Sequence, residues 1–499
     1  GYNRTFGRHA LDGAVNFHIS GYNGDGYFSY KYHYANLNGR INYSYDDRYV
    51  AEFGFSYFGN DAYAKGNQWA FYPSVSAAWV LSNEAFLKDS KVVDLLKLRL
   101  SYGRSGFADS GATGVLSNYS SNGRYLFKDY YTNSYVGSFY MGSGEGVWQS
   151  SLVHMFLANA GVHAEKSSKY NVGIDAELFG KLHLSADAFI DKRTDILTLD
   201  NSMMGYYGKN YYFDNIGKMT NKGVELSAVW NDLRANWGYS INGSVSFNRN
   251  KIDYMAEVAP AYSYNAQTGR PYGTLIGLVA DGFYDVDDFN ADGSLKADLP
   301  QPMFGAVQPG DIKYRDVNGD GVVNTFDKVA IGYTLVPEIN YGFGASLKWK
   351  GIDVSVFFSG VGHVTRIIQG QNLFGASSTI LRMGQIFEDV AKNRWTLDNQ
   401  NPNAPYPRLS LNKVDNNQQL STYWQRDMSF LRLKDAEIGY TLPESMTKKW
   451  GLSKIRFYIQ GKNLVTFSDF KLWDPEVNAN YGNVYPLIRT FAIGANVNF

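Results

Sequence analysis

The sequence contains no cysteine among its 499 residues. A disulfide-stapled scaffold, a thiolate metal site and a cysteine nucleophile are therefore excluded. Proline is also scarce, with 13 residues against 51 glycines, a balance that suits tight turns and smooth strands better than disorder.

The sequence also lacks an excess of charge, because 47 lysines and arginines balance 47 acidic residues. Nucleic acid binding needs a basic stripe, so no nucleic acid partner is expected. The longest wholly apolar run falls far short of the roughly 18 residues of a membrane-spanning helix. A membrane is not excluded by this, since barrel strands need only about 9–11 alternating residues each.

The first residues also carry no leader-like pattern. The sequence begins at Gly1 and shows neither a positively charged n-region nor an apolar h-region. It opens directly in a strand-like segment, residues 2–6. We therefore expect the chain to be part of a longer product, or one whose first half lies elsewhere.

What the sequence does have is alternation, most clearly in residues 37–57. Apolar residues and glycine alternate there with polar residues on both sides of a turn at Asp46-Asp47-Arg48. A period of two on both arms predicts a β-hairpin with one apolar and one polar face. In a soluble sandwich the apolar face would meet a core, whereas in a membrane barrel it would meet lipid and the polar face would line a lumen.

The same alternation recurs along the chain and predicts about fifteen strands. Short turns alternate with long loops, which we expect at about residues 103–166, 192–221, 248–338, 362–429 and 463–487. Outer-membrane barrels separate short periplasmic turns from long extracellular loops in this way, and a sandwich has no reason to do so. An all-β, transmembrane antiparallel β-barrel is therefore favoured over a large soluble β-protein.

Aromatic residues support the membrane interpretation. They make up 16% of the sequence, and several predicted strands end in Trp or Tyr, as interfacial aromatic girdles require. Phe499 closes the last alternating strand with no tail after it. A terminal aromatic in this position is the expected signal for outer-membrane barrel assembly, although an ordinary terminal strand could also end this way.

Many short motifs resemble the C-terminal half of the SusC/RagA group of TonB-dependent transporters. They occur in the right order over nearly the whole chain. These motifs lie at residues 40–49, 71–79, 96–103, 215–219, 221–225, 310–314, 316–321, 393–396, 429–433, 474–477 and 485–490.

The resemblance implies a 22-strand barrel, of which this chain would carry the C-terminal part over residues 1–499. The plug domain, the segment gripped by TonB and the first strands would then lie outside this chain. It further implies TonB-linked import of a bulky glycan or oligopeptide across the outer membrane of a Gram-negative bacterium. A SusD-like surface lipoprotein would be the partner, and a dimer of transporter–lipoprotein pairs is a further expectation.

Two other functions remain open at this point. A passive porin or an adhesin-like outer-membrane barrel would show the same strands, and residues upstream of Gly1 would decide between these and active transport. A soluble glycan-binding or glycan-cleaving β-protein is the third possibility.

The sharpest local motif is an acidic loop with calcium-loop spacing. Side-chain oxygens fall at positions one, three, five, nine and twelve, glycine at six and a backbone carbonyl at seven. We expect Ca²⁺, or Mg²⁺, on the residues Asp316, Asn318, Asp320, Val322, Asn324 and Asp327. The alternative is a solvated Asn/Asp/Gly turn.

Catalytic motifs are absent, because the seven histidines are scattered singly and no HExxH occurs. The chain is therefore not expected to be an enzyme. Loop aromatics could stack on a sugar ring or pack a peptide, or simply pack within the loops. The candidates are Trp148, Tyr206, Tyr207, Tyr211, Tyr212 and Trp424.

Overall fold

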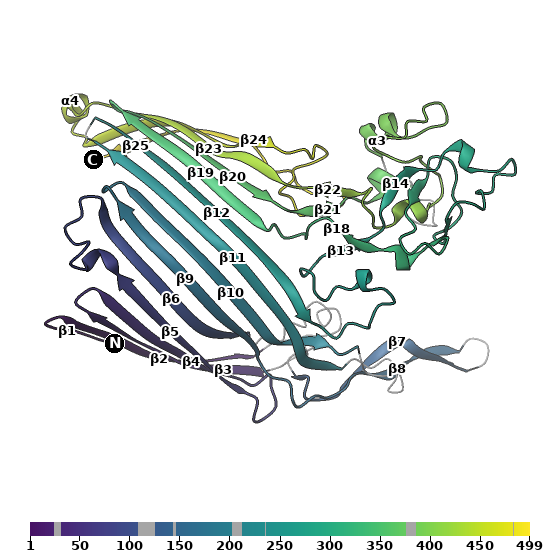
Figure 1. Cartoon of the computed structure of the whole chain (residues 1–499), viewed down its shortest axis with the longest axis horizontal. Coiled ribbons are helices and arrows are strands. Elements are labelled where there is room, and N and C mark those ends of the chain that lie inside the picture. The colour runs from purple at the N-terminus through teal and green to yellow at the C-terminus, as the bar shows by residue number, and fades with distance from the viewer. Residues whose placement is uncertain are drawn as a thin grey trace. The chain divides into compact units, whose positions relative to one another are not determined.

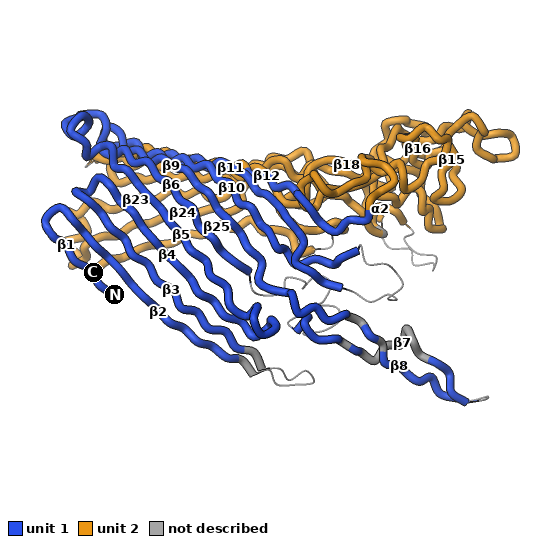
Figure 2. Tube along the Cα trace, turned by 60° about the horizontal axis from the view of Figure 1, so that its bottom comes forward, with its two compact units in different colours: residues 1–228, 248–258 blue, residues 229–247, 259–499 orange. Residues whose placement is uncertain are grey.

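The computed structural model describes residues 1–23, 31–107, 125–142, 146–201, 212–234, 236–375, 386–482 and 484–499. It divides into two compact units, which Figure 2 shows in different colours. Unit 1 comprises residues 1–228 and 248–258, and unit 2 comprises residues 229–247 and 259–499. No helix in the described ranges has the length and apolar character needed to cross a membrane.

Long antiparallel strands dominate both units (Figure 1) and follow one another in hydrogen-bonded order. Unit 1 holds β1 (Tyr2–Phe6), β2 (His9–Asn23), β3 (Lys31–Tyr45), β4 (Tyr49–Asn60), β5 (Trp69–Val80), β6 (Val93–Phe107), β9 (Glu165–Leu178), β10 (Leu182–Leu199) and most of β11 (Phe213–Leu233). Unit 2 holds most of β12 (Trp237–Tyr254), with β19 (Ile339–Trp349), β20 (Ile352–Gly362), β23 (Phe430–Thr441), β24 (Lys454–Phe467) and β25 (Thr490–Asn498). The expected count of about fifteen is confirmed.

Tight turns join neighbouring strands at one end. Lys350 and Gly351 connect β19 to β20 with φ of 45° and 89°. Two consecutive positive φ values are the signature of the type I′ turn, whose twist matches that of the flanking strands. Asp46 and Asp47, both at positive φ, make the corresponding turn between β3 and β4, and Asp tolerates this region better than most residues.

The apolar faces of these strands point outward rather than into a core. Val15 is 71% exposed, Leu100 64% and Val172 55% in unit 1, and Leu347 and Ile438 are each 52% exposed in unit 2. A soluble sheet buries this face. Within each unit, therefore, the outward apolar faces agree with a barrel wall and contradict a dry interior.

Several strands extend into the predicted loops. β10 continues to Leu199 and β11 starts at Phe213, so the expected loop at 192–221 is shorter, and β12 likewise runs on to Tyr254. The expected loop at 103–166 contains a hairpin of β7 (Tyr130–Met141) and β8 (Val147–Phe156), which projects beyond the ends of the long strands in Figure 1. These extensions mix polar and apolar residues on both faces, as at the adjacent Ile196 and Leu197 of β10, so they show no regular alternation.

The loops of unit 2 fold around a core of their own. Four two-stranded sheets pair β13 (Leu275–Gly277) with β18 (Val329–Ile331), β14 (Ala280–Phe283) with β16 (Ile312–Tyr314), β15 (Gln301–Pro302) with β17 (Val322–Val323), and β21 (Thr365–Ile367) with β22 (Gln425–Asp427). Short helices α2 (Gln371–Phe374) and α3 (Glu388–Asn393) lie in the same loops, and α4 (Glu444–Thr447) lies between β23 and β24. Leu278, Ile312, Val323, Ile368 and Val390 are fully buried among these elements. We call this packed set of loops the loop body.

Candidate functional site

The polar face of unit 1 carries an ion cluster built across three strands. Arg99 on β6 contacts Asp175 on β9 at 2.8 Å and Asp187 on β10 at 2.9 Å. A Cβ on Gly173 would lie 2.7 Å from an Arg99 nitrogen and 2.5 Å from an Asp187 oxygen. Glycine at this position therefore leaves the room that the guanidinium needs.

A matching cluster lies on the polar face of unit 2. Arg456 on β24 donates to Asp353 on β20, at 3.0 Å through Nε, and to Glu437 on β23 at 2.5 Å. Each cluster joins one guanidinium to two carboxylates. Hydrogen bonds between charged groups of this kind are shorter and stronger than those between neutral groups. Ion pairs thus cross-link neighbouring strands on the polar face of each unit.

A hollow of about 750 Å³ opens on the polar face of unit 1. Arg40, Glu52, Tyr72, Ser74 and Arg104 are among its lining residues. Its size falls within the ordinary range for ligand pockets, about 300–1,000 Å³. The hollow can therefore accept a small polar group or a side chain from another segment.

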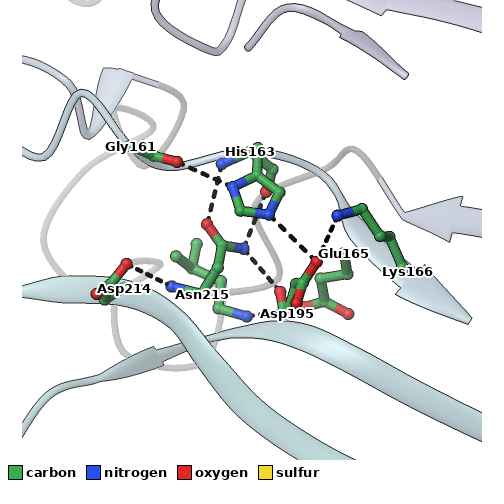
Figure 3. A network of polar contacts seen from close by, with 8 residues as sticks. Gly161, His163, Glu165, Lys166, Asp195, Asp214 and Asn215 are labelled. Atoms are coloured by element: carbon green, nitrogen blue, oxygen red, sulfur yellow. Dashed lines mark hydrogen bonds and ion pairs between the residues drawn. The ribbon is translucent and has the colours of Figure 1, made fainter. Parts of the chain in front are cut away.

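A polar network ties together the outer ends of β9, β10 and β11 (Figure 3). The Asn215 side chain accepts from the His163 backbone N–H at 2.9 Å and donates to the carbonyl oxygens of His163 and Asp195 at 2.9 and 2.7 Å. Lys166 donates to the Asp195 carboxylate at 2.7 Å. His163 faces two acceptors, Gly161 O at 2.9 Å and Asp195 Oδ2 at 3.3 Å, so only the protonated ring donates to both.

Sequence reasoning did not identify this network. It treated His163 as one of several scattered polar histidines, and the contact partners lie 20 to 52 residues apart. The one hint of this network in the sequence was Asn215, the first residue of the motif at 215–219. Its role in joining three strand ends gives that motif a structural reason.

The aromatic residues predicted as loop contacts differ in how far they are buried. Trp424 is 1% exposed, and its indole nitrogen donates to Asn417 O at 2.6 Å. It is therefore part of the loop-body core, and its prediction as a surface stacking residue is wrong. Trp148 on β8 is 66% exposed and Tyr212 is half-buried, whereas Tyr206, Tyr207 and Tyr211 lie outside the described residues.

The interior of the loop body is buried from solvent. Burial raises the pKa of Tyr284 to about 12 and also raises the pKa of Tyr314. The Tyr314 hydroxyl donates a hydrogen bond to the Asn416 carbonyl oxygen at 2.8 Å. Buried Asp311 is held by Arg408 at 2.8 Å and by Asn417 at 2.8 Å.

The acidic loop is held by its own hydrogen bonds. Asp327 is fully buried, and its carboxylate accepts from the backbone N–H groups of Val317 at 2.8 Å, Asn318 at 3.4 Å and Asn324 at 2.7 Å. Asp316 accepts from Gly319 and Gly321, and Asp320 from Val322. In the described part of the chain, His, Cys, Asp and Glu side chains form no group of three that could hold a metal ion. A cation here would therefore also need the Asn318, Val322 or Asn324 oxygens.

The last residue ends the outermost strand of unit 2. Phe499 follows β25 directly and is 94% exposed. Its carbonyl accepts from Ser453 Oγ at 3.3 Å. Its ring is therefore accessible, as a terminal assembly signal requires, and that role stays a prediction.

Comparison with known proteins agrees with this architecture. The family model described as TonB dependent receptor-like, beta-barrel matches residues 1–361. TonB-dependent receptor P3 of Formosa agariphila is 28% identical, over 92% of this chain and 45% of its own length. TonB-dependent receptor SusC of Bacteroides thetaiotaomicron is 25% identical, over 92% of this chain and 43% of its own length. The chain thus spans less than half of these relatives.

A solved structure of the RagAB peptide transporter superimposes with a TM-score of 0.75 and 20% identity, covering 100% of this chain and 54% of the transporter chain. At this identity the likeness concerns the fold alone. Together with the family match, it confirms the resemblance to the SusC/RagA group. The chain belongs to the family of TonB-dependent receptor-like β-barrel proteins.

Proposed function

We propose that this chain is the barrel part of an active importer. It would move a bulky nutrient, a glycan or an oligopeptide, across the outer membrane of a Gram-negative bacterium with energy delivered through TonB. The carrying observation is a set of long strands with an exposed apolar face and an ion-paired polar face. This division matches a lipid-facing wall around a hydrated lumen, and the family consists of outer-membrane transporters.

The proposal includes a SusD-like surface lipoprotein as the partner, in an assembly of one or two such pairs. The support in unit 1 is the β7–β8 hairpin, which projects beyond the long strands (Figure 1). It exposes large apolar side chains at Tyr131, Phe139, Val147, Trp148 and Leu152, each more than half exposed. A cluster of exposed apolar residues on a polar loop surface is typical of a protein contact.

Affinity purification of the full-length protein from outer membranes in mild detergent tests the partnership. We expect a surface lipoprotein to copurify with the wild-type protein, and Trp148→Ser with Leu152→Ser to reduce its recovery at least fivefold. Leu411→Ser, at a 66% exposed loop residue, is the control and should leave recovery unchanged. Recovery of a lone barrel from wild-type cells would contradict the proposed partner.

Uptake assays test the energy source separately. Cells that use the importer should lose accumulation of the cargo when TonB is deleted or when a protonophore collapses the inner-membrane gradient. Uptake that persists at the same rate would favour a passive porin.

We further propose that the loop at residues 316–327 binds Ca²⁺, or more weakly Mg²⁺. The support is the spacing of its oxygen ligands and the lone pairs that its carboxylates keep beyond their backbone hydrogen bonds. The bound ion would fix this segment within the loop body and take no part in chemistry.

A further inference from the structure

Two arginines occupy directly opposed positions on neighbouring strands of the loop body. β21 and β22 pair antiparallel, with Arg366 directly opposite Arg426. Residues opposed in this way project from the same face with Cβ atoms about 4.5–5.5 Å apart. Like charges in this arrangement destabilise the pair unless something neutralises them.

Nothing in the described part of the chain neutralises this pair. Arg366 is only 8% exposed, donates through Nη1 to the Asn478 side chain, and has a buried Nε with no hydrogen-bond partner. Arg426 donates through Nη1 to the carbonyl oxygens of Tyr423 at 2.7 Å and Gln425 at 2.9 Å. Neither guanidinium forms an ion pair with any described carboxylate, which leaves several N–H groups free to bind a ligand.

Two other arginines of unit 2, half-buried Arg408 and buried Arg432, have carboxylate partners. Arg408 is paired with Asp311 at 2.8 Å, and Arg432 with Asp474 at 2.6 Å. An unpaired buried charge is costly, and burial accordingly lowers the pKa of both Arg366 and Arg426. Carboxylates thus neutralise Arg408 and Arg432, whereas the opposed pair Arg366 and Arg426 has no such partner among the described residues.

Among the described residues near the pair, no carboxylate forms an ion pair with either arginine. Asp427 alternates to the other face of β22 and accepts from the Ser429 N–H at 2.8 Å. Tyr406 and Tyr423 influence Arg426 electrostatically, but both hydroxyls donate, to Asp389 at 2.6 Å and to the Ala404 carbonyl at 3.1 Å. No described carboxylate therefore contacts either guanidinium directly.

We propose that the Arg366–Arg426 pair binds a carboxylate group of the imported cargo. This rests on the proposed function, and it adds that the cargo is anionic. A guanidinium offers two parallel N–H groups that match the two oxygens of a carboxylate. Two guanidiniums on one face can hold one carboxylate between them, as a bulky cargo passes the loop body.

Binding of matched probes to the purified full-length protein tests this site. Peptide C-termini and uronic acids both supply carboxylates, so one pair is a tetrapeptide acid and its amide. The other pair is trigalacturonate and its methyl ester. We expect at least one charged probe to bind tenfold or more tightly than its neutral counterpart. The pair that discriminates identifies the source of the carboxylate.

Arg426→Gln should reduce that preference to less than threefold. Arg315→Gln is the control, because Arg315 is an exposed loop arginine already paired with Asp281 at 2.6 Å, and it should keep the full preference. The ligand-free melting temperature adds a second readout. It should stay unchanged or rise in Arg426→Gln, whereas loss of a merely structural arginine would lower it.

Three results would overturn the site: no preference for either charged probe, a preference that survives Arg426→Gln, or a clear fall in melting temperature without loss of preference. These outcomes differ from failure of the proposed function. Arg426→Gln leaves the β7–β8 hairpin intact, so lipoprotein copurification should continue in the variant.

Discussion

At the scale of single residues, Asp327 shows what spacing can and cannot predict. The sequence places its oxygens at the last position of a calcium-type loop, and the structure buries it as the acceptor of three backbone N–H groups. The spacing of oxygens was visible in sequence. The hydrogen bonds that already occupy them depend on the fold of residues 316–327, which a pattern of residue types does not specify.

Asp327→Asn is expected to loosen this loop. The amide replaces one acceptor oxygen by a donor that faces backbone N–H groups, so about 2–3 kcal/mol of local stability should be lost. Hydrogen exchange of residues 316–327 measures the change. Ca²⁺ should slow exchange in the wild type and have little effect in Asp327→Asn, and an equal lack of effect in both would contradict the proposed cation.

The arginine pair could not be predicted from sequence either. Arg366 and Arg426 lie 60 positions apart in segments without alternation, and only the register of β21 with β22 makes them neighbours. Arg99 is the opposite case. It lies on a strongly alternating strand, so its polar-face position was predictable, although its two carboxylate partners were not.

At the scale of elements, alternation predicted the long strands well wherever one face is apolar. The boundaries of the loop at 362–429 agree with the ends of β20 and β23. Prediction failed at the outer ends of β10, β11 and β12, because polar and apolar side chains mixed on both faces remove the period of two while backbone pairing continues. It also failed in the loop body, where strands of two to four residues are too short to show any period.

The loop body depends on its own apolar core, and Trp424 is the largest residue buried in it. Trp424→Ala should cost about 3–5 kcal/mol of loop-body stability and greatly accelerate proteolysis within residues 259–338 and 362–429. Trp148→Ala removes an exposed indole and should change stability by less than about 0.5 kcal/mol. Equal protease resistance in the two variants would contradict the packing role of Trp424.

At the scale of the whole molecule, composition limited the class of protein and the family match decided it. A cysteine-free, aromatic-rich chain with zero net charge and no long apolar run is compatible with a soluble β-protein as well as with a barrel. The outward apolar faces of the strands in each unit remove that ambiguity. The sequence does not predict the cargo, because this chain spans less than half the length of its curated relatives.

The central claim is that the apolar side of each strand faces lipid and the polar side faces water. The absence of cysteine in this chain allows single spin labels to be placed at Leu100 and Val172 on one face, and at Ser101 and Asn171 on the other, in the full-length protein in bilayers. We expect collisions with oxygen to dominate at the first two positions, and collisions with a water-soluble nickel complex to dominate at the other two. Labels at Leu100 and Val172 that are shielded from both reagents, or accessible to nickel, would contradict the account.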